Sequence, residues 1–360
     1  KAELKRKSEM SRPGGEKDGV QKADTVWMKD EYVPVTSFVH TVQLDNYRRI
    51  YEAYETPASY YLSDYYTPTT FTGDSIYDKS TCWQLRNTIG IALLEGFNKW
   101  AKAGLKAFAT YNMRHFTLPK IGEDNLMRLS GYNERELSVG AQMLKTQGHV
   151  VHYDVSGEFW IGNGKTGQFH VDASADLNVP LFGDTLQVLA NAFVHRDEPL
   201  LLENTYHSRH AWWDNDFDAQ FHTRLMGELS LKRLGTRLRV GYDNIKDYIY
   251  LAHQYDLTES GTDYQVHNYQ VAMLQHGGAI SVITAQLRQN LTFWNVLHWD
   301  NEFTFQKSSN DDVLPVPSLN VYSNLYLRFK IARVLKCDLG ADVRYFTKYY
   351  APEYSPYMGQ

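Results

Sequence analysis

The chain has 360 residues, a formal net charge of −5 at pH 7 and 43% hydrophobic residues. No run of about eighteen uncharged apolar residues occurs, which excludes membrane-spanning helices. It does not exclude a transmembrane β-barrel, because half of each barrel strand faces water. The acidic balance and the lack of a long basic stripe give no reason to expect a nucleic-acid partner.

Residues 1–30 are charged and rich in Gly and Lys, with "RPGGEKDG" at their centre, and we expect a flexible polar arm. The start "KAELKRKSEM" has no apolar core, so it is not an intact signal peptide. Either a signal has been removed or the protein is not exported. Residues 31–360 are predicted to form one β-barrel. Within them, "NYRRIYEAY" (46–54) has Tyr and Ile at helical spacing, which predicts a short helix.

From Val33 onward, polar and apolar residues alternate with a period of two, which is typical of β-strands. Most segments exceed the usual five or six residues and reach the roughly nine to eleven that a tilted strand needs to cross a bilayer. The predicted strands are 83–95, 102–116, 135–147, 149–161, 168–179, 185–196, 217–231, 236–251, 269–290 with a break at "QHGG", 295–306, 319–331 and 335–349, with one or two more between 33 and 54.

Short connections between these strands alternate with long ones. "KTQG", "LFGD", "KRLG" and "ARVL" are short, whereas "TLPKIGEDNLMRLSGYNE", "RDEPLLLENTYHSRHAWWDND", "AHQYDLTESGTDYQ" and "KSSNDDVLPVP" are long. Short turns on one side and long loops on the other indicate an outer-membrane barrel, although the short "GNGKTG" breaks the pattern. A soluble sandwich or lipocalin-like barrel also alternates, and strand length is the main argument against it.

The two faces of each strand differ in polarity. In 167–179, for example, His170, Asp172 and Asp176 alternate with Val171 and Ala175. A charge that faces lipid near the midplane costs about 2 to 4 kcal/mol for Arg or Lys, so the polar sets should line a wet lumen. The candidate lumen-lining residues are Arg86, Lys106, Arg114, Asp154, Glu158, Asp172, Asp176, His222, Arg224, Glu228, Arg237, Arg239, Arg328, Lys330, Asp338, Asp342 and Arg344. They would either create a transverse field or form salt bridges that fill a closed barrel.

The aromatic residues suit two membrane interfaces, where Trp and Tyr gather at the headgroup level. The candidate interface anchors are Phe97, Trp100, Trp212, Trp213, Tyr345, Tyr349 and Tyr350. A glycan-binding platform could use the same residue types in loops.

No cofactor and no catalysis are expected. Asp214, Asp216 and Asp218 match the start of a calcium loop, but the required Gly and the closing Glu are missing, so they are weak metal candidates only. No G-x-S-x-G elbow or other nucleophile signature occurs. Cys82 and Cys337 match no metal spacing and imply no disulfide framework.

Four stretches, "VPVTSFVHTV" (33–42), "GDSIYDK" (73–79), "ALLEGFNKWAKAGLKAFATY" (92–111) and "LGADVRYFTKYYAPEYSPYMGQ" (339–360), resemble the large "putative porin" family of the Bacteroidota outer membrane. The resemblance runs from about Val33 to the end. It implies a β-barrel in the outer membrane and passive passage of solutes. Such barrels continue to a terminal aromatic strand, so the chain resembles a section of a longer one.

We therefore expect an all-β, antiparallel transmembrane barrel that acts as a porin-like channel for passive passage of small hydrophilic solutes. The alternative is a nonconducting outer-membrane barrel that serves as a scaffold or a surface-binding module for glycan or protein. Membrane lipid and small solutes are the expected partners. A homo-oligomer or an association with other outer-membrane proteins is left open.

Overall fold

The computed structural model describes residues 36–54, 65, 76–95, 103–121, 127–162, 165–181, 183–260, 263–352 and 354–355, together with the short pairs 6–7 and 27–28. Most of this chain forms one antiparallel sheet of 13 strands. Its strands are β3 (Thr36–Ala53), β4 (Ile76–Leu93), β5 (Gly104–Ile121), β6 (Met127–Lys145), β7 (Val151–Ile161), β8 (Phe169–Leu181), β9 (Asp184–Asp197), β12 (Gln220–Leu231), β13 (Thr236–Ser260), β14 (Asp263–Phe293), β15 (Leu297–Ser308), β16 (Leu319–Ile331) and β17 (Leu335–Phe346).

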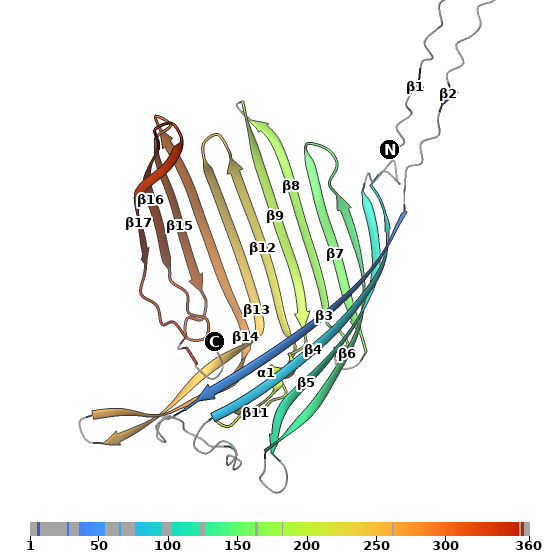
Figure 1. Cartoon of the computed structure of the whole chain (residues 1–360), viewed down its shortest axis with the longest axis vertical. Coiled ribbons are helices and arrows are strands. Elements are labelled where there is room, and N and C mark those ends of the chain that lie inside the picture. The colour runs from blue at the N-terminus through green and yellow to red at the C-terminus, as the bar shows by residue number, and fades with distance from the viewer. Residues whose placement is uncertain are drawn as a thin grey trace, which may run out of the picture.

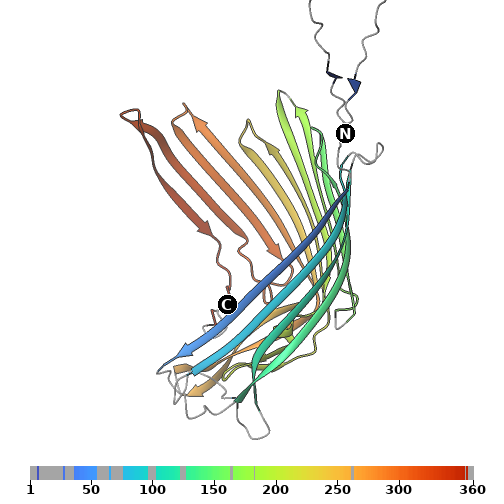
Figure 2. The same ribbon diagram turned by 45° about the vertical axis from the view of Figure 1, so that its right-hand side comes forward.

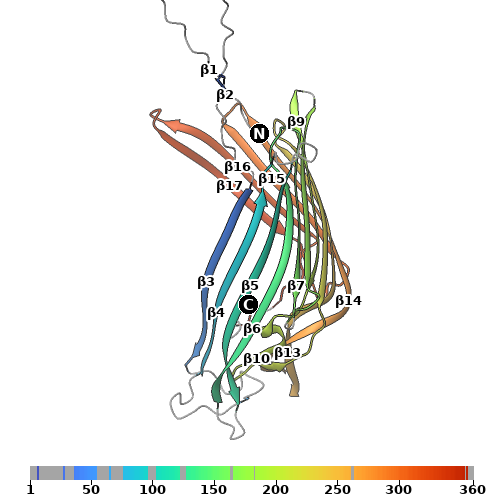
Figure 3. The ribbon, with the colours of Figure 1, turned by 90° about the vertical axis from the view of Figure 1, so that its right-hand side faces the viewer.

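Strands that follow one another in sequence are neighbours in this sheet, which curves around one concave side (Figures 1, 2 and 3). β3 and β17 are its two edges. The one interruption lies between β9 and β12, which pair directly with each other. The intervening loop holds α1 (Leu201–Asn204), β10 (Thr205–His207) and β11 (Trp212–Asp214). β1 (Arg6–Lys7) and β2 (Trp27–Met28) pair separately, and most of residues 1–30 lies outside the described part.

Two local predictions were wrong. Segment 46–54 is not a helix but forms the end of β3, where Arg49 pairs with Ser80 of β4. Its apparent helical spacing arose because Tyr and Ile occur on both faces of the strand. Segment 269–290 is not broken at "QHGG" either, since β14 continues through it. The pairing shifts between Lys246 and Tyr248, so Gly277 and Gly278 lie in a β-bulge opposite Asp247, whose φ is 58°.

The two ends of the sheet differ only in part as predicted. Two of the four predicted long connections, 117–134 and 252–265, are mostly strand, because β5, β6, β13 and β14 extend into them. At one end, pairs such as β12–β13 and β16–β17 are joined by tight turns. In the first of these, a Cβ on Gly235 would lie 2.2 Å from the Asn290 carbonyl oxygen, and its φ is 63°, so only glycine fits there. At the other end, the β9–β12 and β15–β16 connections are long. β13 and β14, with 25 and 31 residues, are the longest strands of the sheet, and their hairpin projects sideways from it at this end (Figure 1).

One face of the sheet is apolar and exposed. Leu225, Leu339 and Val343 are 61%, 65% and 65% exposed, and no second layer of described residues covers them. A soluble sandwich would bury these side chains against a second sheet, so the exposed apolar face is incompatible with that alternative. No helix in the described part of the chain is long and apolar enough to cross a membrane.

Candidate functional site

The strand register places every predicted lumen residue on the opposite, polar face. His170 of β8 pairs with His195 of β9, which pairs with His222 of β12, and side chains paired in this way point to the same side. The same relation continues from Glu228 to Arg239 on β13. It connects, strand by strand, Arg86, Lys106, Arg114, Asp154, Glu158, Asp172, Asp176, Arg224, Arg237, Arg328, Lys330, Asp338, Asp342 and Arg344.

The β9–β12 loop, residues 198–219, shows that this polar face is the concave one. Tyr206 of β10 accepts a hydrogen bond from Arg49 of β3, at one edge of the sheet. The amide of Asn215 donates to the Met273 carbonyl of β14, 3.3 Å away and nine positions further along the strand order. A single loop can contact strands this far apart only by lying inside the curve. We call it the inner loop.

The inner loop has its own small core. Tyr206, Ala211 and Trp213 are buried together with Val271 of β14. The rings of Tyr206 and Trp213 stack at 4.8 Å, and the Trp213 indole donates to the Leu202 carbonyl at 3.1 Å. This is the main buried apolar cluster of the described chain, so the loop is packed firmly onto the wall.

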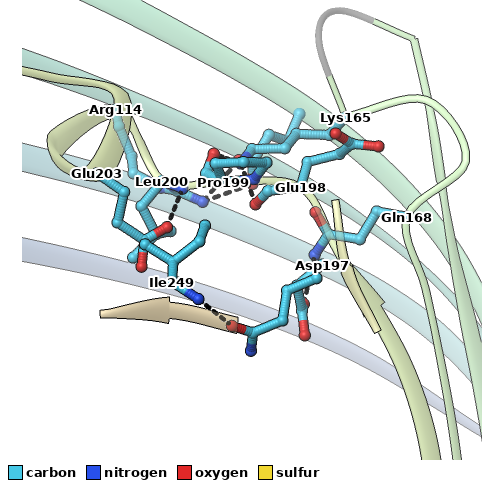
Figure 4. Close-up of a pocket in the computed structure, with 11 residues that line it drawn as sticks. Arg114, Lys165, Gln168, Asp197, Glu198, Pro199, Leu200, Glu203 and Ile249 are labelled. Atoms are coloured by element: carbon cyan, nitrogen blue, oxygen red, sulfur yellow. Dashed lines mark hydrogen bonds and ion pairs between the residues drawn. The ribbon is translucent and has the colours of Figure 1, made fainter. Parts of the chain in front are cut away.

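A cavity of about 290 Å³ separates the inner loop from the wall (Figure 4). Arg114, Glu136 and Gln168 line it on the wall side, and Leu200 and Glu203 line it on the loop side. Its lining therefore combines charged groups of both signs with backbone from the start of the loop.

Lys165, in the β7–β8 connection, attaches the inner loop at this cavity. Its ammonium group donates to the carbonyl oxygens of Glu198 and Pro199, at 2.9 and 2.6 Å. Burial lowers the pKa of Lys165, while the nearby carboxylates of Glu134 and Glu136 act in the opposite direction. The lysine is thus a buried cation that depends on its acidic neighbours.

Arg114 of β5 forms the centre of the neighbouring ion-pair cluster. It contacts Glu134 at 3.0 Å and Glu136 at 2.6 Å on β6, and Asn112 also donates to Glu136 at 3.1 Å. Only Arg114 of this group was predicted. The predicted strand began at 135 and so left Glu134 in a loop, although its alternation with Glu136 was a signal that could have extended the strand.

Other predicted lumen residues pair along the wall. Glu228 forms ion pairs with both Arg237, at 3.1 Å, and Arg239, at 2.7 Å. Arg328 and Asp338 form a pair at 2.9 Å. The structure therefore contains ion pairs of the kind that the sequence suggested.

The predicted aromatic anchors fall into three groups. Trp212 and Trp213 do not lie at the outer rim, because they belong to the inner loop: Trp213 is buried, and Trp212 stacks on His207 at 3.8 Å. Tyr345 is exposed on the apolar face, and Tyr349 and Tyr350 follow the end of β17. Phe97 and Trp100 lie outside the described residues.

The weak calcium candidates do not gather into a site. Among described residues, Asp214, Asp216 and Asp218 form no close group of three ligands. Asp214 instead contacts His207 at 2.8 Å. This contact depends on the pairing of β10 with β11, which the sequence does not reveal.

These features define a class of protein: a long-stranded antiparallel sheet, curved with its apolar face outward and its charged face inward, is the wall of an outer-membrane β-barrel. The chain belongs to the family described as "Putative porin", whose model matches residues 12–360. Family and fold together place it in the bacterial outer membrane. No curated protein matches the sequence.

Solved structures show the same fold. A variant of the ferric enterobactin receptor PfeA from Pseudomonas aeruginosa, in complex with enterobactin, is 15% identical with a TM-score of 0.57 over 91% of this chain and 50% of the receptor. The siderophore receptor PirA from Acinetobacter baumannii is 10% identical with a TM-score of 0.51, over 81% and 45% of the two chains. The chain thus spans about half the length of the structures it matches.

Proposed function

We propose that this protein is a porin-like channel through which small hydrophilic solutes pass passively, without a chemical step. The observation that supports the proposal is the mainly polar face on the concave side, which carries both Arg–carboxylate clusters and uncharged groups such as Ser174 and Asn191. A hydrated wall of this kind lets ions and polar solutes cross without full desolvation. Passage would be through the barrel interior, with membrane lipid on the outside.

The inner loop would narrow this passage. It crosses from β3 to β14 within the curve and carries buried aromatic rings that keep it there. A loop anchored at both sides of a barrel limits the size of the solutes that pass, and the charged groups beside it act on their charge.

The direct test is the conductance of the purified full-length protein in a planar lipid bilayer. Stepwise, ohmic conductance is the expected result. Two cysteine variants of neighbouring residues then locate the pathway, in a background where Cys82→Ser and Cys337→Ser remove the native thiols. Ser174→Cys lies on the inward face and Ala175→Cys on the outward one.

A charged, water-soluble methanethiosulfonate reagent should reduce the conductance of Ser174→Cys and leave Ala175→Cys unchanged. Because the two residues are adjacent and similar in size, a difference between them reports the face alone. Equal sensitivity, or modification of Ala175→Cys only, would reject the assignment of the inner wall.

A nonconducting scaffold or surface-binding barrel is the second candidate. The packed core of the inner loop favours it, because a loop held this firmly could close the interior. A protein that is inserted and folded, yet electrically silent, would support this candidate over the channel. The origin of the protein in the Bacteroidota and the suggestion that the chain is a section of a longer barrel stay predictions.

A further inference from the structure

Three histidines form a row across the inner wall. His170, His195 and His222 are directly paired on β8, β9 and β12, and the rings of His170 and His195 lie with their centroids 4.2 Å apart. Each ring contacts a carboxylate: Asp197 at 2.6 Å, Asp172 at 3.0 Å and Asp243 at 2.9 Å.

Two of the histidines converge with one carboxylate. One side-chain ligand atom each from His170, His195 and Asp197 lie within 4.8 Å of one another. An ion about 2.1 Å from each ligand, in tetrahedral geometry, needs separations of about 3.4 Å. His170 Nε2 and Asp197 Oδ1, which are 2.6 Å apart, therefore have to separate by about 0.8 Å, and no other pair has to close by more than roughly 1.4 Å. Small side-chain rotations supply changes of this size without moving the strands.

Neighbouring groups already orient these three side chains. Trp160 packs edge-on against His170 at 4.7 Å, and Phe193 stacks on His195 at 4.3 Å. Gln168 donates to the Asp197 carboxylate at 3.3 Å. His195 contacts Asp172 through Nε2, which leaves its Nδ1 as the second ring nitrogen. A carboxylate behind a ligating histidine fixes the ring and raises its basicity, as in many zinc sites.

We propose that His170, His195 and Asp197 bind a divalent transition-metal ion such as Zn²⁺ on the inner wall. Two imidazole nitrogens and one carboxylate oxygen suit the borderline ions of the first row, rather than Ca²⁺ or Mg²⁺, which prefer oxygen alone. The proton that His170 shares with Asp197 leaves to solvent when the ion binds. Water from the interior completes the coordination, because all three side chains are partly exposed. The site stands whether or not the barrel conducts.

The test is titration of Zn²⁺ alone into the detergent-purified full-length protein, without a histidine tag, followed by calorimetry. We expect one saturable site. His170→Ala and His195→Ala should each weaken it by tenfold or more. Asp172→Asn should weaken it by about tenfold, because loss of a carboxylate that contacts a ligating histidine typically costs 10- to 100-fold. His152→Ala is the matched control, since His152 also faces inward and lies beside a carboxylate, Asp176, at 3.6 Å.

Cu²⁺ provides a second readout that a purely structural role would not change. Its electron paramagnetic resonance spectrum should show coupling to two imidazole nitrogens in the native protein and to one in His170→Ala. Heat-modifiable migration on gels checks that each variant is folded. Absence of a Zn²⁺ site, or binding that survives both ligand variants as well as it survives His152→Ala, would overturn the proposal.

Discussion

At the scale of single residues, the face on which a side chain lies decides what it can be replaced by. Ala175 is the central residue of the 13-residue strand β8, and it is exposed on the apolar face. Its neighbour Ser174 points inward, opposite Asp154 and Asn191. The two positions share a backbone environment, but one side chain faces the interior and the other faces outward. A comparison of substitutions at the two positions therefore isolates the contribution of lipid contact to stability.

Ala175→Arg should lower the free energy of unfolding by about 2 to 4 kcal/mol, because it places a guanidinium group in lipid near the midplane. Ser174→Arg should change it by much less, since its charge reaches water and Asp154. Urea unfolding of the protein in lipid vesicles, followed by tryptophan fluorescence, measures both. If the two variants lose equal stability, the outward face is not in contact with lipid.

The inward residues could be predicted from the sequence because a period of two is sufficient to sort them once a strand is recognised. His170 and His222 were sorted in this way, yet the meeting of His170 with His195 and Asp197 depends on the register between β8 and β9. Lys165 and Tyr206 could not be found, because they acquire their partners only when the inner loop folds back. No local pattern in the sequence encodes which strand a loop returns to.

At the scale of elements, strand existence was easier to predict than strand ends. β5 continues to Ile121 and β6 begins at Met127. Both strands therefore include residues that the sequence pattern assigns to a polar loop. Polar residues such as Glu134 resemble loop composition, but on an inward face they are tolerated throughout a strand. The inner loop shows the reverse case, since its Trp212 and Trp213 suggested a membrane interface and instead pack inside.

Tyr206→Ala should release the inner loop. The ring is 2% exposed, stacks on Trp213 and accepts a hydrogen bond from Arg49. Removing a buried aromatic ring of this size lowers stability by about 3 to 5 kcal/mol. We expect a short loop that loses this much packing energy to detach from the inner wall. Limited proteolysis should then cut within the loop, and the conductance should rise.

The control for this variant is Leu202→Ala, in the same loop, because the Leu202 side chain is 38% exposed and only its carbonyl holds Trp213. It should leave both readouts near those of the native protein. A Tyr206→Ala protein that resists protease and conducts like the native one would show that the loop is held by its polar contacts alone.

At the scale of the whole molecule, the fold separates two environments with one layer of backbone. Apolar side chains need no partner on the outer face, since acyl chains meet them, and charges on the inner face remain hydrated or paired. This arrangement explains why the largest buried cluster of the described chain lies under a loop rather than between two layers. In the proposed channel, the balance of charge inside, and not the surface charge overall, would set the field that acts on a solute.

The Glu228 cluster provides a test of that field. Glu228 is buried between Arg237 and Arg239, whose side chains are 45% and 38% exposed. Glu228→Gln retains the shape and an acceptor oxygen but leaves two positive charges uncompensated on the inner wall. The reversal potential in a KCl gradient should shift toward that of Cl⁻, and the shift should be smaller in about 1 M salt than in 0.1 M, where the screening length is about 10 Å rather than 3 Å.

Glu52→Gln removes the same charge from the outward face of β3, where Glu52 accepts a hydrogen bond from Tyr54, and should leave the reversal potential unchanged. The comparison separates a local field in the passage from a change in net charge, because both variants alter the net charge equally. A shift of the same size in both variants, or one that does not weaken with salt, would show that the inner charges do not act on the permeating ions.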